Sequence, residues 1–390
     1  MTDSRARQAI ADWIADHPRS IPGRIAALRY GQPHGGPAPV VHADVAADTT
    51  VLMAPANYAG QAYAWCRALE AARPNLSARN YALESPFGFP ADAVISPAVF
   101  HNSRRWQREQ LTAAHGFTHF LAESFIPPFG RLLDRDVERQ LDALGAQVDV
   151  AFMCHGTDIR SPRQAGIRTS WAPVGDDHAT RRAEILAARH RDLLARSSRP
   201  VFVSTPDLLQ DVPDAAWCPV VIDPGVWRRT TRDFDRRIRV VHTPSKAATK
   251  GSAHIEPVLA RMAERGVIDY TPLRSVAHSR MPEVLATADV VVDQMSYGIY
   301  GVAACEAMAA GCTVVSHVTE EVRGIVRRQT DLDLPIVEAT PGTLEDVITA
   351  LAADPDRRAG LAVRGMAFAN TVHDGTRSAQ VLLDGWIESP

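Results

Sequence analysis

Arginine supplies most of the basic side chains in this chain and lysine is scarce, yet Lys246 and Lys250 lie in one short loop. The loop follows the predicted strand 238–245 and also contains Ser245 and Gly251. Ammonium groups at the carboxyl end of a strand suit the negative charge of a diphosphate. A solvated loop without a ligand is the alternative interpretation of the same residues.

A glutamate stands in a second segment, where the sequence otherwise predicts a buried helix. Gly298 and Gly301 allow a tight turn after the predicted strand 288–295. The helix expected at 302–310 has free N–H groups and the positive end of its dipole at its start, so that end can bind an anion. Glu306, inside this helix, could accept hydrogen bonds from the vicinal hydroxyls of a ribose. It could equally pair with an arginine on a half-exposed helix face.

Two turns in the first half of the chain also follow predicted strands. The strand expected at 148–156 ends near His155, and Asp158 comes shortly after it. A histidine at this place either contacts a ligand or is a buried side chain satisfied within the protein. The turn after the first predicted strand is interpreted either as part of a binding site or as a simple strand-to-helix turn. Its residues are Ala59, Gly60 and Gln61.

Alternating apolar runs and helical stretches predict an α/β protein built from two doubly wound, Rossmann-like domains. Such runs, separated by helices, form parallel sheets that are covered on both faces. Two facing domains of this kind create a cleft at the carboxyl ends of their strands. The strand-like runs are 49–56, 117–124, 148–156 and 199–206 in the first half, and 238–245, 267–273, 288–295, 312–319 and 334–341 in the second.

The domain boundary is expected where a polar, arginine-rich run interrupts this alternation. Residues 1–225 are predicted to form an N-terminal domain, with 1–47 as a variable leader. Residues 226–370 are predicted to form a C-terminal domain. The tail 371–390 is apolar on one face and is expected to form a helix that packs back toward the N-terminal domain.

Composition excludes several classes of protein. The 390 residues, 46% hydrophobic and 22% charged, are enough for two domains with full cores. A net charge of −3 favours neither nucleic acid nor an anionic membrane. The five cysteines form no C-x-x-C pair and lie in apolar surroundings, which predicts reduced, buried thiols in a cytoplasm. No secretory signal and no membrane-spanning run is recognised.

Other chemical motifs carry little weight. Four D-x-D matches, a pattern known to bind a metal ion and a diphosphate, lie in helical or loop charge patterns, and no metal site is expected. No G-x-G-x-x-G follows a strand, and no G-x-S-x-G is present. The basic tract 102–110 could contact an anionic ligand or a membrane surface, although a solvated helix face explains it better. The D-x-D matches are 134–136, 233–235, 331–333 and 354–356.

Three segments, "HTPSKAATKG", "ADVVVDQ" and "YGIYGVAACEAMAAGCTVV", together resemble the donor-binding domain of the family-4-type retaining glycosyltransferases, which have the GT-B fold. That family has a Lys-Gly pair after a basic residue, and an E-x7-E motif that ends in Glu-Ala-Met-Ala. Lys250-Gly251 matches the first, and Glu306 matches the second Glu. The family's first Glu falls at Gly298, so that carboxylate is missing here. Asp293 and Gln294 are near enough in sequence to replace it.

The resemblance implies an enzyme, a hexosyltransferase that moves a sugar from a nucleoside diphosphate to an acceptor with retention of configuration. It implies no metal and no cofactor, and the acceptor stays open. The alternatives are a sugar-nucleotide 2-epimerase of the same fold, or a sugar-nucleotide-binding subunit without catalysis. Catalytic roles are expected for His155, Lys246 and Lys250. Donor contacts are expected for Ser245, Gly251, Asp293, Gly298, Ile299, Tyr300, Gly301, Val302 and Glu306, and cleft contacts from the first domain for Ala59, Gly60, Gln61 and Asp158.

Overall fold

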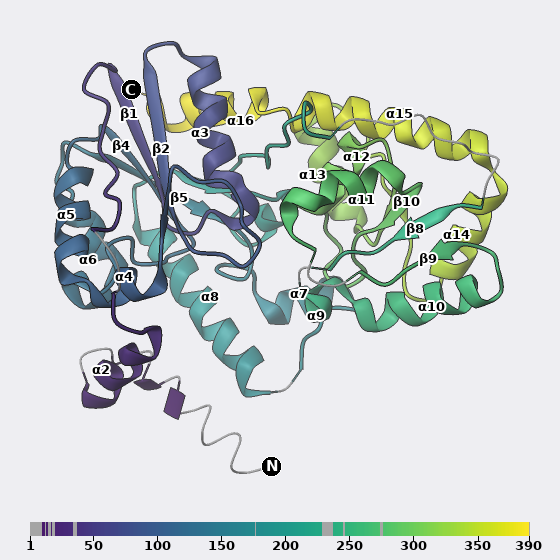
Figure 1. Cartoon of the computed structure of the whole chain (residues 1–390), viewed down its shortest axis with the longest axis horizontal. Helices are drawn as coiled ribbons and strands as arrows, with labels where there is room; N and C mark the ends of the chain where they lie inside the picture. The colour runs from purple at the N-terminus through teal and green to yellow at the C-terminus, as the bar shows by residue number, and fades with distance from the viewer. Residues whose placement is uncertain are drawn as a thin grey trace.

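A computed structural model describes residues 10, 11, 13, 14, 17, 20–33, 37–175, 177–227, 237–244, 246–273 and 276–389. The described chain forms two α/β domains that lie side by side (Figure 1). One domain has a sheet of seven strands and the other a sheet of five, and all strand pairs are parallel. The predicted fold class, two doubly wound domains, is therefore confirmed.

The first sheet has the strand order β3-β2-β1-β4-β5-β6-β7. Its strands are β1 (Thr49–Ala54), β2 (Leu76–Leu83), β3 (Ala93–Ile95), β4 (His119–Glu123), β5 (Asp149–Cys154), β6 (Val201–Val203) and β7 (Ala216–Trp217). The helices of this half are α2 (Ile21–Ala27), α3 (Gln61–Ala72), α4 (Pro97–Asn102), α5 (Arg104–Ala114), α6 (Val137–Asp142), α7 (Pro162–Arg168) and α8 (His178–Arg196).

The second sheet has the order β12-β11-β10-β8-β9, which is the 2-1-3-4-5 arrangement of flavodoxin-like domains. Its strands are β8 (Arg239–Val241), β9 (Asp269–Tyr270), β10 (Val290–Val292), β11 (Thr313–Ser316) and β12 (Val337–Glu338). Its helices are α9 (Ala247–Lys250), α10 (Ser252–Glu264), α11 (Met281–Thr287), α12 (Val302–Ala309), α13 (Glu320–Thr330), α14 (Leu344–Ala353) and α15 (Pro355–Val372).

The central strands are largely apolar because helices cover both faces of each sheet. Successive strand residues point to opposite faces. In β1, Val51 and Met53 therefore pack with α3, whereas Leu52 and Ala54 pack toward α4, α5 and α6. A parallel sheet buried on both faces requires such near-continuous apolar strands. This explains why the central strands could be found from sequence.

Three strands of the first sheet, β2, β3 and β7, were not predicted from sequence. β2 includes Ser77, Arg79 and Asn80, polar residues that argue against a buried strand. In the fold, the Asn80 amide donates to Asp92 Oδ2 at 2.8 Å, and the Asp92 amide donates to Asn80 Oδ1 at 3.0 Å. Arg79 also donates to Glu70 Oε1, so most of the polar groups of this strand find partners in neighbouring segments. Local pattern does not contain that information. The other two missed strands are short: β3 has three residues and β7 has two.

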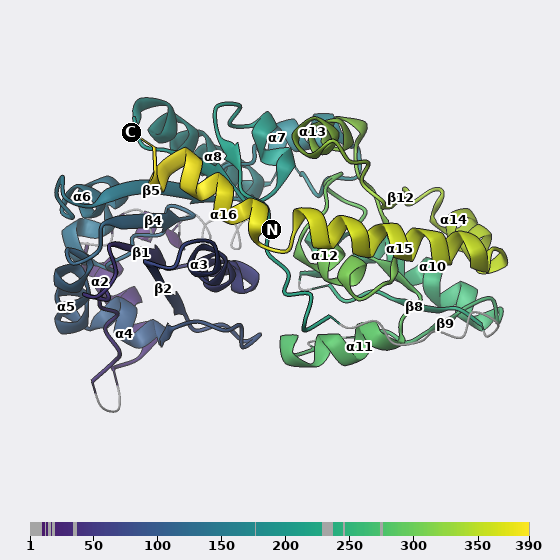
Figure 2. The same ribbon diagram turned by 90° about the horizontal axis from the view of Figure 1, so that it is seen from above.

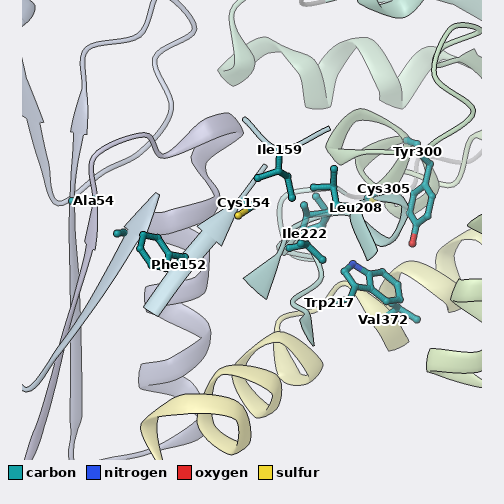
Figure 3. Packing of buried hydrophobic residues seen from close by; sticks show 14 of the residues in the cluster. Ala54, Phe152, Cys154, Ile159, Leu208, Trp217, Ile222, Tyr300, Cys305 and Val372 are labelled. Carbon is teal, nitrogen blue, oxygen red and sulfur yellow. The ribbon is translucent and has the colours of Figure 1, made fainter. Parts of the chain in front are cut away.

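One apolar core continues from the first domain into the second. Figure 3 shows Cys154 and Ile222 on one side of this cluster and Tyr300 and Cys305 on the other, with Trp217 between them. All five cysteines of the chain are buried free thiols, as predicted. A continuous core between domains restricts how they can move against one another.

The chain crosses between the domains twice. The first crossing follows β7, and its residues 228–236 lie outside the described chain. The second follows α15, and the Ile222 amide donates to the His373 carbonyl at 2.7 Å, which ties the two crossings together. After it, α16 (Thr376–Leu382) lies along the first domain, next to α3 (Figure 2). Leu382 and Trp386 are fully buried there against Trp65.

Candidate active site

Two adjoining cavities lie between the domains, at the carboxyl ends of the strands. The smaller, of about 240 Å³, is here named the aromatic cavity, and its walls include Phe87, Phe89, Leu273, His278, Met281 and Glu306. The larger, of about 500 Å³, is named the polar cavity, and its walls include His155, Asp158, Arg160, Lys246, Asp293 and Tyr297. Three residues line both cavities: Ala59, Lys250 and Val302.

Lys250 stands where the cavities meet, and a buried carboxylate fixes its ammonium group. Lys250 Nζ lies 2.5 Å from Asp293 Oδ1. The second oxygen of Asp293, Oδ2, is buried and has no hydrogen-bond partner among the described residues. Gly251, directly after Lys250, has a φ of +73°, and a Cβ there would lie 2.8 Å from Ser296 Oγ. Gly251 lines neither cavity, so its role is to let the chain turn and place Lys250.

The other predicted residues of this loop divide between the cavity and the undescribed chain. Lys246 is exposed at the start of α9 and lines the polar cavity. Lys246 and Lys250 are the only lysines in the chain, and both line this one cavity. Ser245 lies outside the described residues. The polar cavity therefore holds every lysine ammonium of the protein.

The start of α12 faces the same place. Ile299 and Gly301 line the polar cavity, and Val302, the first residue of α12, lines both cavities. The amides of a helix's first turn have no partner within the helix, so they point out of its N-terminal end. The structure therefore brings a helix N-terminus and the ammonium of Lys250 to the junction of the two cavities, an arrangement that suits an anion.

Glu306 lies one turn further along α12, inside the aromatic cavity. Its side chain is 8% exposed, and His278 Nε2 lies 2.8 Å from Glu306 Oε1. Burial raises the pKa of the Glu306 carboxyl above its ordinary value, and the bond with His278 opposes that rise. The sequence also allowed another interpretation, in which Glu306 pairs with an arginine on a half-exposed helix face. The partner is instead a histidine, and the carboxylate is buried in a cavity wall.

Besides Gly251, two more residues that the motif alignment assigned to donor binding line neither cavity. Tyr300 is 1% exposed, and its ring packs in the core between the domains (Figure 3). Gly298 has a φ of +68°, and a Cβ there would lie 2.4 Å from Thr319 Cγ2. Position 298 thus faces α13 rather than a ligand. Ile299, which stands between Gly298 and Tyr300 in the sequence, does line the polar cavity. An alignment assigns consecutive residues to one role, whereas the backbone turns them to different sides.

Neither side chain that could replace the missing glutamate is free. The Gln294 side chain accepts hydrogen bonds from the amides of Ser296 and Tyr297, and it donates to the carbonyls of Ile299 and His317. It lines the polar cavity but is used to hold the loop together. Asp293 also lines this cavity, with one oxygen bound to the Lys250 ammonium and the other buried.

On the first domain, His155 and Asp158 line the polar cavity. The Asp158 carboxylate accepts hydrogen bonds from the backbone amides of His155, at 2.9 Å, and Gly156, at 2.6 Å. Its charge therefore fixes the turn after β5. The His155 ring is almost buried, 8% exposed, and its Nε2 lies 3.2 Å from Oε1 of Glu123, a carboxylate with no exposed surface.

The turn after β1 has an unusual backbone. Asn57, Ala59 and Gly60 have φ values of 47°, 52° and 75°, so three of its residues are left-handed and two of these are not glycine. Ala59 lines both cavities, whereas Gly60 lines neither. Gln61 lines the polar cavity, but its side chain exchanges two hydrogen bonds with the backbone of Val221, at 2.6 and 3.2 Å. Left-handed residues of this kind persist where surrounding contacts hold them, and they gather at functional sites.

Sequence analysis missed several residues of the site. Phe87 and Phe89 come from the loop between β2 and β3, two strands that were not expected, yet they line the aromatic cavity. His278 had no local signal, because its importance comes from Glu306. Glu123 could have been noticed as a carboxylate at the end of an apolar strand.

The D-x-D matches within the described residues line neither cavity. Asp136 and Asp354 accept N-cap hydrogen bonds from helix amides, and Asp333 pairs with Arg327. The match at 233–235 lies outside the described residues. Among the residues that the structure describes, no group of three metal-ligating side chains is found. In the basic tract 102–110, Arg105 pairs with Glu109 on the surface of α5.

No protein-family model matches the sequence, and no curated protein matches it. Solved structures do match in fold. HepE of Anabaena, in complex with UDP-glucose, superposes with a TM-score of 0.56 at 14% identity, over 86% of this chain and 98% of that one. Sucrose-phosphate synthase of Thermosynechococcus elongatus gives 0.54 at 13%, over 86% and 97%.

WaaG, a glycosyltransferase involved in lipopolysaccharide biosynthesis, gives a TM-score of 0.52 at 11% identity, over 86% of this chain and 99% of that one. At these identities the similarity shows the fold alone. The chain has the GT-B fold, as the motif resemblance predicted. No helix among the described residues is long and apolar enough to cross a membrane.

Proposed function

We propose that the protein is a glycosyltransferase that takes a sugar from a nucleoside-diphosphate donor bound between its two domains. The observation that carries this proposal is the meeting of two cavities at Lys250 and the start of α12. A nucleotide sugar has the matching order of parts: a base and ribose, then a diphosphate, then a sugar. The cation and the helix N-terminus occupy the middle, where the diphosphate would lie.

The aromatic cavity suits the nucleoside. Phe87 and Phe89 provide flat apolar surface for a base, and the Phe89 ring lies 4.8 Å from that of His278. Glu306 in the wall of the same cavity offers carboxylate oxygens to the ribose hydroxyls. Its partner His278 can donate to only one oxygen at a time, so the carboxylate keeps acceptor capacity for a ligand. Structures of HepE hold UDP and UDP-glucose, which supports a uridine nucleotide as the donor here.

The diphosphate charge would be neutralised by protein groups. An ammonium has three N–H donors, and Asp293 uses one donor of Lys250, which leaves two for phosphate oxygens. Lys246 and the α12 amides add positive potential from the same side. These groups would stabilise the charge that develops on the leaving diphosphate, and neither a metal ion nor a cofactor is needed for that step.

The polar cavity suits the sugar and the approach of an acceptor hydroxyl. The two carboxylates in its wall are already used: Asp158 binds two backbone amides, and Asp293 binds Lys250. A covalent glycosyl intermediate, or the acid–base chemistry of a 2-epimerase, needs a free carboxylate beside the sugar. We therefore favour hexosyl transfer with retention through attack on the leaving-group face, with the leaving phosphate oxygen accepting the proton of the acceptor.

Calorimetry with UDP, GDP, UDP-glucose and inorganic pyrophosphate tests the proposal. Wild type should bind UDP and UDP-glucose, and Glu306→Gln should weaken UDP about tenfold while leaving pyrophosphate unchanged, since a hydrogen bond to a charged group contributes about 1.5–3 kcal/mol. Glu283→Gln, on the exposed side of α11, is the matched control. Absence of nucleotide binding would contradict the proposal, and equal losses for both ligands would move Glu306 out of the ribose site.

A further inference from the structure

Glu123 lies under the floor of the polar cavity and holds two of its walls at once. β4 lies between β1 and β5 in the sheet, so a side chain at the end of β4 can reach the turns after both neighbours. The Ala56 amide donates to Glu123 Oε2 at 2.9 Å, and the Asn57 amide donates to the same oxygen at 3.0 Å. On the other side, His155 Nε2 lies 3.2 Å from Glu123 Oε1. The carboxylate has no exposed surface.

These contacts decide which nitrogen of His155 holds its proton. Both Glu123 oxygens already accept hydrogen bonds from backbone amides, so the carboxylate is an acceptor toward the ring as well. Nε2 then has the hydrogen, and in the neutral ring Nδ1 is left as an acceptor. Among the described residues Nδ1 has no hydrogen-bond partner, and it is not sealed from solvent.

The ring itself is held in place by aromatic neighbours. Tyr58 meets it edge to face at a centroid distance of 5.2 Å, and Trp65 lies nearly parallel to it at 5.7 Å. Tyr58 comes from the left-handed turn that Glu123 fixes through Asn57. The same carboxylate therefore sets the ring's tautomer and the position of the turn beside it.

We propose that Glu123 is a positioning residue that holds His155 as the Nε2–H tautomer, so that Nδ1 is presented to the polar cavity as a hydrogen-bond acceptor for a substrate hydroxyl. This inference rests on the proposed function for the identity of the ligand, a hydroxyl of the donor sugar or of the acceptor. The state of the ring does not depend on that function and can be measured without any ligand.

The variant Glu123→Gln tests the tautomer directly. The glutamine oxygen can take the place of Oε2, which accepts both backbone amides, and its NH₂ group then faces His155. That group can only donate, so Nε2 must become the acceptor and the proton moves to Nδ1. The turn keeps its two hydrogen bonds to the Oε2 position and loses only the longer contact of the Asn57 amide with Oε1, at 3.1 Å. The atom presented to the cavity changes from acceptor to donor.

Nitrogen-15 NMR of the imidazole rings distinguishes the two tautomers, and the variant His155→Gln is used to assign the signal. Wild type should show the Nε2–H form and Glu123→Gln the Nδ1–H form. The Nδ1–H form in wild type, or no change in the variant, would overturn the proposal. If the variant does not fold, the wild-type spectrum alone decides.

Turnover gives the second readout. With UDP-glucose as probe, Glu123→Gln should lower kcat for UDP release about tenfold, the effect of one hydrogen bond, and leave the Kd for UDP within about twofold. A rise of about tenfold in the Kd for UDP, with kcat unchanged, would mean that Glu123 acts only through the turn. If wild type neither binds nor turns over the donor, the proposed function fails while the tautomer result stands.

Discussion

The two walls of the cleft use their carboxylates in different ways. On the second domain, carboxylates meet basic side chains: Asp293 pairs with Lys250, and Glu306 pairs with His278. On the first domain, Asp158 binds the amides of two residues, and Glu123 binds the amides of two more in addition to the His155 ring. Three non-glycine residues near these carboxylates, Asn57, Ala59 and Ser124, have left-handed backbones.

The difference shows which wall is set by charge and which by backbone shape. A side-chain pair beside a cavity can exchange one partner for a ligand, since its basic member is partly exposed, 20% for Lys250 and 27% for His278. A carboxylate bound to backbone amides has no such freedom, because releasing them leaves buried donors without a partner. We therefore expect changes on the second domain to affect ligand affinity, and changes on the first to affect stability and geometry.

The largest effect is expected for Lys250→Ala. Nucleoside-diphosphate affinity should fall about 10- to 150-fold, because a charge-assisted hydrogen bond is lost. The free energy of unfolding should also fall by roughly 3 kcal/mol, because Asp293 is left buried without its partner. Calorimetry and urea denaturation measure the two effects. The double variant Lys250→Met with Asp293→Asn should recover most of the stability and none of the affinity. Recovery of both would place the diphosphate elsewhere.

The substitution Gly298→Ala tests whether backbone conformation also constrains the second domain, at the turn before α12. A side chain at positive φ costs about 1–2 kcal/mol, and forcing a methyl against Thr319 adds about 1–3 kcal/mol. Urea denaturation should show a loss of this summed size. Adding Thr319→Ser removes Cγ2, the atom 2.4 Å from the new Cβ, and keeps the hydroxyl that caps α13. The double variant should therefore recover the steric part alone. A tolerated Gly298→Ala would show that this turn is not constrained.

Asp158→Ala should separate the two walls most clearly. Two backbone amides lose their acceptor, so the free energy of unfolding should drop by roughly 2 kcal/mol. UDP affinity should stay within about twofold, because Asp158 offers the ligand no free oxygen. Asp158→Asn keeps one acceptor oxygen, and its loss of stability should be about half as large. A fall in UDP affinity at unchanged stability would show that Asp158 binds the donor.

The smallest effect is expected for the stability of Glu306→Gln as pH changes. Burial raises the pKa of Glu306 in the folded state, so its favourable contribution is complete below the ordinary carboxyl value and is lost as pH rises through the raised value. The glutamine variant has no such loss. Its stability relative to wild type should therefore increase from pH 4 to pH 8. His278 and Lys250 oppose the rise, and Asp293 adds to it. A difference that is constant with pH would contradict the assignment.

Much of the fold and part of the site could be predicted from sequence. Apolar strands alternating with helices predict two parallel sheets, because a sheet covered on both faces requires that pattern. The Lys-Gly loop and the glycine turn before Glu306 predict an anion site, and the structure places Lys246, Lys250 and Val302 in one cavity. The motif alignment put Gly251, Gly298 and Tyr300 in that site as well, and none of the three lines either cavity. Local spacing does not determine which way a turn faces.

The sequence by itself determined the residues that could bind an anion and the strand ends on which they lie. The tertiary structure alone decided their partners. His278 is 28 residues from Glu306, Asp293 is 43 from Lys250, and Asn57 is 66 from Glu123. A hydrogen bond over such a separation depends on strand order and on the packing of one domain against the other. For that reason, the same glutamate could be a surface ion pair in one fold and the buried wall of a cavity in this one.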